Sequence, residues 1–211
     1  MKHATTLALL VTLAPMTAGA DELPFLRPSV EYSGTRVMDT AQGRMEQKLY
    51  WTPEKVRTET NFQGMNVTNI VRQDLGVMWI VNPAMPNCLE QSLDEIDDAP
   101  GMAHSDAVDA GNVEYTELGK ETIDGIRTTH YEVISRDAGE IHRAQFWVTA
   151  ENIPLKMVVE PSAADVAVTM TLEDLKIGSV DAGLFEAPGQ CMRMPATPGM
   201  PGMPPTGSGQ P

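Results

Sequence analysis

Turn signals recur about every ten residues along this chain, and this spacing restricts the folds open to it. Pro53-Glu54, Gln63-Gly64, Asp124-Gly125 and Glu151-Asn152 separate segments in which apolar and polar residues alternate. Alternation is typical of half-buried strands, because successive side chains point to opposite faces of a sheet. Turns at this interval are typical of an antiparallel meander. Eleven candidate strands and few helical segments therefore predict an all-β protein whose twisted sheet curls on itself.

One of these segments, residues 76–83 (GVMWIVNP), is apolar at nearly every position. In a regular strand Met78 and Trp79 point to opposite faces, so both faces are apolar here. A sheet with one face in water does not need such a strand. We expect one side to pack under a core or lid and the other to face an apolar concavity. A strand covered on both sides would have the same sequence.

Residues 92–112 interrupt the strand pattern with an acidic stretch around Pro100-Gly101. Connections of this length inside a compact domain are usually functional or mobile. We therefore interpret residues 92–112 as a long connection or a lid-like flap.

The two ends of the chain differ in composition from the part between them. Residues 1–20 have a basic start, an uncharged apolar run and the small residues Ala18-Gly19-Ala20, which predicts a signal peptide cleaved after Ala20. No run approaches the roughly 20 apolar residues of a transmembrane helix. Residues 191–211 are rich in Pro, Gly and Met, so we expect a disordered tail after a domain of residues 21–190.

The net charge of −14 excludes several kinds of partner. Nucleic acids require a basic surface that releases counterions from phosphates. Anionic membranes likewise attract basic segments. The acidic balance instead predicts a self-repelling surface, which fits a monomer.

The two cysteines, Cys88 and Cys191, are too far apart for a local redox or zinc motif. In an oxidising compartment an even count allows one disulfide, and we favour that bond over two free thiols. It would close a loop of about 100 residues, which the chain-entropy model rates at roughly 4–5 kcal/mol.

The order of features resembles a known family over residues 29–191. The resemblance rests on GRMEQKLYWTPEKVRTET, VRQDLGVMWIVNPAMPNCLEQ, LGKETIDGIRTTHYEV, AQFWVTAENIPLKMVVE and DAGLFEAPGQC. Together they are similar to an uncharacterised family of exported bacterial proteins, related in fold to the outer-membrane lipoprotein carrier and sorting proteins. The resemblance implies an unclosed half-barrel with a lid, an apolar concave side that holds acyl chains, and no catalytic residues. Cys191 stands where an aromatic residue is usual and Cys88 where tyrosine is frequent, which is consistent with a bond between them.

The candidate ligand-lining residues are the large apolar side chains of the expected strands. They are Trp51, Met78, Trp79, Ile80, Trp147, Met157 and Met170. Burial in a core is the ordinary role of such residues, at about 1.5–3 kcal/mol each, so a ligand site needs more apolar surface than the core uses. No Gly-x-Ser-x-Gly or His-Glu-x-x-His motif is present, and we expect no catalytic residue, cofactor or metal site.

These observations predict a periplasmic, non-enzymatic protein that binds a lipid or an acylated ligand. One alternative is a structural or interaction protein of the envelope, with a barrel filled by its own side chains and an envelope protein as partner. A further alternative uses Met192, Met194, Met200 and Met203 of the tail, because thioether ligands suit Cu(I).

Overall fold

The computed structural model describes residues 27–40, 43–62, 64–85, 87–94, 113–137, 140–161 and 167–193. In these ranges the strands are β1 (Tyr32–Thr40), β2 (Gly43–Thr52), β3 (Lys55–Phe62), β4 (Met65–Arg72), β5 (Val77–Val81), β6 (Cys88–Ser92), β7 (Val113–Ile123), β8 (Ile126–Asp137), β9 (Glu140–Val148), β10 (Pro154–Val159), β11 (Val168–Ile177) and β12 (Cys191–Arg193). Two single-turn 3-10 helices, η2 (Gln73–Leu75) and η5 (Ala182–Phe185), accompany them. The predicted all-β class is confirmed.

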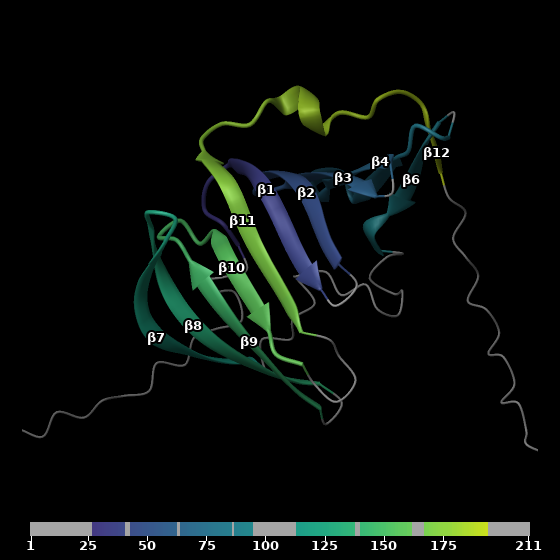
Figure 1. Cartoon of the computed structure of the whole chain (residues 1–211). Coiled ribbons are helices and arrows are strands. Elements are labelled where there is room, and N and C mark those ends of the chain that lie inside the picture. The colour runs from purple at the N-terminus through teal and green to yellow at the C-terminus, as the bar shows by residue number, and fades with distance from the viewer. Residues whose placement is uncertain are drawn as a thin grey trace, which may run out of the picture.

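All twelve strands belong to one sheet that does not close (Figure 1). Their spatial order is β12-β6-β5-β4-β3-β2-β1-β11-β10-β9-β8-β7. Two meanders, β1–β6 and β7–β11, therefore join where β1 pairs antiparallel with β11. β7 forms one edge of the sheet and the short β12 forms the other. This open, curved sheet is the half-barrel that the resemblance implied.

The pairing register assigns the strand side chains to two faces. Residues paired across strands share a face, so Tyr32, Trp51, Val56, Val71 and Met78 form one continuous row. We call this side the apolar face. The opposite side, called the polar face, carries rows such as Thr35, Lys48, Glu59 and Thr68.

A bulge in β11, opposite Gly34 of β1, interrupts the pairing at the centre of the sheet. The β1–β11 register shifts between Ser33 and Thr35, where Asp174 adopts a positive φ of 54°. Such bulges bend a strand and strengthen its right-handed twist. A Cβ atom on Gly34 would lie 2.9 Å from Leu172 Cδ1 and 3.0 Å from the Glu173 carbonyl oxygen, so any larger residue would require these neighbours to shift.

Buried side chains form clusters on both faces of the sheet. On the apolar face, Tyr32, Leu49 and Leu172 cluster with Ile153 and Leu155. A second cluster contains Val133 and Val148. On the polar face, Ile70 and Trp79 pack against Phe185, which belongs to η5.

Residues 178–190 connect β11 to β12, and we call them the strap. In Figure 1 the strap passes above β1–β4, with η5 near its middle. Arg57 Nη1 donates to the carbonyl oxygen of Leu184 at 2.9 Å, and Arg72 Nη1 donates to that of Phe185 at 3.1 Å. Asp181 caps η5 by accepting from the Gly183 amide at 2.9 Å. Two arginines of the sheet thus hold the backbone of the strap.

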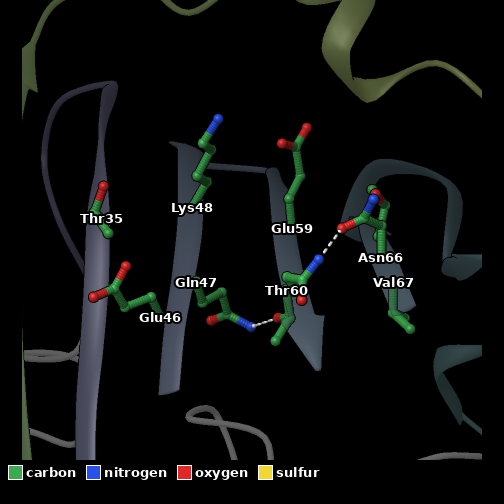
Figure 2. A pocket seen from close by; sticks show the side chains of 10 residues that line it. Thr35, Glu46, Gln47, Lys48, Glu59, Thr60, Asn66 and Val67 are labelled. Atoms are coloured by element: carbon green, nitrogen blue, oxygen red, sulfur yellow. Dashed lines mark hydrogen bonds between the residues drawn. The ribbon is translucent and has the colours of Figure 1, made fainter. Parts of the chain in front are cut away.

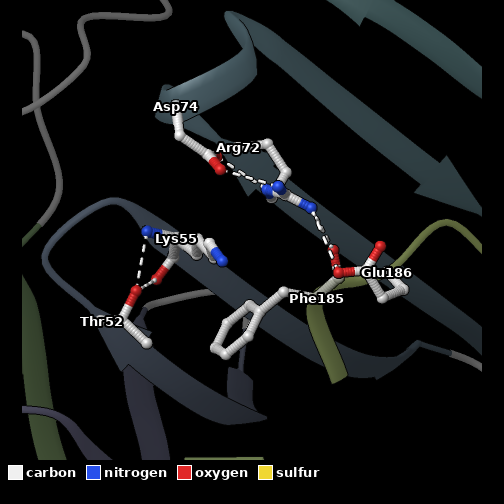
Figure 3. A network of polar contacts seen from close by, with 6 residues as sticks. All are labelled: Thr52, Lys55, Arg72, Asp74, Phe185 and Glu186. Carbon is white, nitrogen blue, oxygen red and sulfur yellow. Dashed lines mark hydrogen bonds and ion pairs between the residues drawn. The ribbon is translucent and has the colours of Figure 1, made fainter. Parts of the chain in front are cut away.

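Arg72 is itself held by Asp74 (Figure 3). Arg72 Nε and Nη2 donate to the two carboxylate oxygens of Asp74, each at 2.7 Å. Arg72 is 8% exposed, and its guanidinium also lies 5.7 Å from the centre of the Trp79 ring. The hydrogen bond from Arg72 is the main cause that holds the pKa of Asp74 below its usual range. The pair therefore orients Arg72 toward the strap.

This ion pair makes the free energy of unfolding depend on pH in the acidic range. A carboxylate whose pKa is depressed by folding stabilises the protein above its unfolded pKa of about 3.9, and that stabilisation is lost as the pH falls through the folded pKa. We expect Asp74→Asn to lower the urea midpoint at pH 7 and to flatten its decline below about pH 4. The measurement is a set of urea denaturation curves from pH 7 to pH 2. Glu160→Gln, at an exposed position outside the pair, is the control. If the urea midpoint fell equally with pH in the two variants, the pair of Arg72 and Asp74 would not be a source of the acid dependence.

Several sequence predictions fall on residues outside the described ranges. The signal peptide of residues 1–20 lies there, as does most of the expected lid, since description stops at Asp94 and resumes at Val113. At the other end, Cys191–Arg193 form β12, so the sheet extends three residues beyond the predicted boundary at residue 190. Residues 194–211 of the expected tail are not described.

Candidate functional site

A continuous row of large apolar side chains crosses six strands of the apolar face. Each member is paired directly with the next across the sheet and is half-buried. In spatial order from β2 to β8, the members are Met45, Met38, Met170, Met157, Phe146 and Tyr131. We call this set the methionine row.

The dimensions of the methionine row suit a long hydrocarbon. Adjacent strands lie about 4.8 Å apart, so six strands extend the row over roughly 24 Å along the sheet. The hydrocarbon core of a bilayer is about 30 Å thick, so an acyl chain that spans one leaflet is about 15 Å long. Methionine is flexible and polarisable, so it adapts to irregular apolar partners. The row can therefore contact an acyl chain along its whole length.

The structure places five of the seven sequence candidates on the apolar face. Met157 and Met170 belong to the methionine row. Trp51 stacks on Tyr32, with ring centroids 6.1 Å apart. Met78 and Ile80 lie on the same face nearer to β6, where Ile80 pairs with Leu89.

Trp79 and Trp147 do not join this group, because both lie on the polar face. Trp79 is 7% exposed beneath Phe185, and its Nε1 donates to Glu90 at 3.0 Å. Trp147 Nε1 donates to Glu121 at 2.9 Å. The Trp147 ring stacks on His130 with centroids 4.2 Å apart, and Lys156 Nζ lies 4.6 Å from its centre. Both indole N–H groups donate a hydrogen bond to a glutamate, and neither side chain lies on the apolar face.

Four members of the methionine row are absent from the predicted set of lining residues: Met38, Met45, Phe146 and Tyr131. A signal for two of them existed, since Met38 and Met45 face each other across the β1–β2 turn. The pairing of Met38 with Met170 joins residues from opposite halves of the chain, and nothing local announces it.

Burial changes the pKa values of two side chains on the apolar face, Tyr32 and Arg36. It raises the pKa of Tyr32 to about 12, partly offset by the nearby Arg36. Burial also lowers the pKa of Arg36. The Trp51 Nε1 atom is also buried, and it has no hydrogen-bond partner among the described residues.

The polar face carries a groove of about 580 Å³ (Figure 2). Most of its lining side chains belong to that face, including Thr35, Lys48 and Glu59. Two further lining residues, Gln47 and Asn61, are tied to Thr60 and Asn66 by hydrogen bonds of 2.9 and 2.6 Å. In the described part of the chain no group of three or more His, Cys, Asp or Glu residues could hold a metal ion. The groove is therefore a mainly polar surface hollow, unlike the methionine row.

Cys88 and Cys191 are joined by a disulfide, with their Cα atoms 4.5 Å apart. They also pair in the parallel ladder between β6 and β12. Of the tail methionines, only Met192 lies in the described ranges, where it is 51% exposed on β12. Within those ranges, no helix has the length and apolar character needed to cross a membrane.

Comparison with known proteins identifies similar sequences and folds. A family model described as a domain of unknown function (DUF4412) matches residues 34–153. No curated protein matches the chain. An uncharacterised conserved protein from Thermus thermophilus has a similar structure, with a TM-score of 0.53 and 12% identity, covering 79% of this chain and 90% of that one.

MucB is also similar in structure, with a TM-score of 0.54 and 14% identity over 81% of this chain. The match covers 62% of the MucB chain, so this chain spans less than two thirds of it. MucB in complex with MucA(peri) matches with a TM-score of 0.51 at 13% identity, covering 81% of this chain and 58% of that one. At these identities the likeness concerns the fold alone, and it agrees with the expected half-barrel.

Proposed function

The chain belongs to the DUF4412 family, a domain of unknown function, and on that premise we propose that it is a non-enzymatic binding protein that holds an acyl chain or a similar apolar ligand on its apolar face. The methionine row is the observation that carries this proposal. Its six members are half-buried. Phe146 and Tyr131 pack against the cluster of Val133 and Val148, whereas the four methionines belong to none of the clusters described above. Contiguous apolar surface of this kind usually marks an interaction or ligand site.

The polar character of the rest of the molecule supports a role in binding without catalysis. Charged side chains on the polar face pair with one another, as Arg44 does with Asp39, Glu46 and Glu173. We propose export to the periplasm after cleavage at Ala20, since a disulfide persists in an oxidising compartment. The working domain would then be residues 21–193.

A substitution in the centre of the methionine row tests the proposal. Met157→Asp would place a charge between Met170 and Phe146, one strand further from Arg36, and an unpaired charge in an apolar site is strongly unfavourable. We expect this variant to bind a fluorescent fatty-acid probe at least 10-fold more weakly than the wild type. Thr171→Asp is the matched control, because Thr171 lies on the neighbouring strand β11, directly after the partner of Met157, but on the polar face beside Lys156.

The measurements are probe titrations, with melting curves to verify that both variants fold. Native mass spectrometry of mature protein purified gently from periplasm, before and after organic extraction, identifies any bound lipid. Equal losses in the two aspartate variants would contradict a site on the apolar face. Failure of the wild type to bind any acyl probe would refute the proposal itself.

A second candidate is an interaction protein of the envelope, favoured by the fold shared with MucB in its complex with MucA(peri). In this case the apolar face would be filled by the chain itself or by a partner segment. A bare chain in the mass spectrum, together with no probe binding, would favour this candidate.

A further inference from the structure

Arg36 is the one charged side chain that the described strands from β12 to β10 place on the apolar face. Its neighbours on that face are uncharged: Gln47 on β2 and Leu172 on β11 are its paired residues. Met38, in the methionine row, is two residues away on the same strand and face. Residues at this spacing lie about 6.6 Å apart along a strand. A guanidinium therefore lies beside the proposed acyl-chain site, near the β2 end of the methionine row.

This guanidinium has few partners. Nη1 donates to Gln47 Oε1 at 3.3 Å, and Gln47 Nε2 in turn donates to Thr60 Oγ1 at 2.9 Å. Among the described residues no carboxylate lies within ion-pair distance of Arg36. An arginine offers five N–H donors and stays protonated in proteins. Most of its donor capacity, and all of its charge, is thus unmatched by this part of the chain.

Arg44 shows how the same sheet treats an arginine that is only structural. It lies on the polar face, 51% exposed, with three carboxylates from β1, β2 and β11 within 3.8 Å. Arg36 lies half-buried on the apolar face, where burial lowers its pKa and no described acid compensates its charge. An uncompensated charge that is partly removed from water is costly to keep, so it indicates a missing counter-charge.

A second unmatched donor lies on the same face. Trp51 Nε1 is buried without a hydrogen-bond partner among the described residues, and Trp51 stacks on Tyr32, whose hydroxyl interacts with the charge of Arg36. The apolar face therefore offers donors where acceptor oxygens are lacking. A ligand that brought oxygen atoms and negative charge would supply the partner that Arg36 lacks.

We propose that Arg36, oriented by Gln47 and Thr60, binds the anionic head group of an amphiphile whose hydrocarbon chain lies along the methionine row. This inference rests on the proposed function and narrows its ligand class from apolar molecules to anionic amphiphiles. The head group is a carboxylate or a phosphate, since a guanidinium fork matches both in bidentate geometry. A free fatty acid and an acidic phospholipid are the two sources of this chemistry.

The test compares three ligands by isothermal titration at pH 8: hexadecanoate, hexadecanol and a lysophosphatidylglycerol. The proteins are the mature wild type, Arg36→Met, Arg36→Lys and the control Arg44→Met. Methionine keeps much of the apolar stem of Arg36 without its charge. We expect the wild type to bind hexadecanoate 10- to 100-fold more tightly than hexadecanol, in line with charge-assisted hydrogen bonds.

In Arg36→Met this preference should disappear while hexadecanol affinity stays within about threefold of wild type, and in Arg44→Met it should remain. Arg36→Lys should keep part of the preference, because it retains the charge but not the planar fork. Tighter binding of the lysophospholipid than of hexadecanoate would assign the head group as phosphate, and the reverse order as carboxylate. An unchanged preference in Arg36→Met would overturn the inference. Equal binding of acid and alcohol by the wild type would overturn it as well, while leaving the proposed function in place. Binding of no ligand by the wild type would refute both.

Discussion

Reducing the Cys88–Cys191 disulfide is expected to lower the free energy of unfolding by about 4–5 kcal/mol. The two cysteines are 103 residues apart in the sequence, so the bond restricts a long loop in the unfolded chain. The folded state adds a local reason. β12 consists of three residues in parallel pairing with β6, and Met192 and Arg193 are exposed. The disulfide is therefore the main link that holds this end of the strap at the edge of the sheet.

The measurement is urea denaturation of the wild type and of a Cys88→Ser, Cys191→Ser double variant, each with and without reductant. The wild type should lose stability on reduction, whereas the double variant should already be less stable and should not respond to reductant. Hydrogen exchange at β6 should increase in both reduced wild type and double variant, since the pairing with β12 is lost. A change below about 1 kcal/mol would show that the strap is held without the bond, against the chain-entropy expectation.

The sheet could be predicted from the sequence because its determinants are local. Alternation marks each strand, and the turn signals between them fix the order of a meander. Asp124-Gly125 is an example: both residues have positive φ, 49° and 81°, as a two-residue hairpin turn of this kind requires. β12 could not be predicted in this way. It is three residues long, pairs parallel with β6, and depends on a bond to Cys88 from far along the chain.

The candidate site was only partly predictable, because alternation gives the relation of residues within a strand but not between strands. Met78 and Trp79 were correctly expected on opposite faces, yet the sequence did not tell which face was apolar throughout. Trp147 is a further example. Its strand pairs with β10 through a register shift between Pro154 and Lys156, which a pattern of alternating residues does not reveal. The methionine row appears only when β1 is paired with β11, across the junction of the two meanders.

Phe185→Ala is expected to lower the free energy of unfolding by about 3–5 kcal/mol, the usual cost of truncating a buried phenylalanine. Phe185 is 1% exposed, and it is the one fully buried side chain of the strap. Its ring packs with Ile70 and Trp79, and half-buried Tyr50 and Val77 complete its surroundings. The sequence analysis did not foresee this role, because Phe185 lies between strands, where no alternation assigns it a face. The truncation would leave a void over Trp79 and weaken the contact that places the Phe185 carbonyl in front of Arg72.

Leu75→Ala is the control, because Leu75 is 55% exposed in η2 close to the same arginine. Surface substitutions of this kind usually change stability by less than about 0.5 kcal/mol. Urea denaturation gives both free energies, and near-ultraviolet circular dichroism reports whether Trp79 keeps its environment. A loss in Phe185→Ala no larger than in Leu75→Ala would mean that the strap does not stabilise the sheet. The free energy of unfolding could also fall strongly while the folded fraction binds an acyl probe as the wild type does. The strap would then stabilise the polar face without affecting binding, because the methionine row lies on the other side of the sheet.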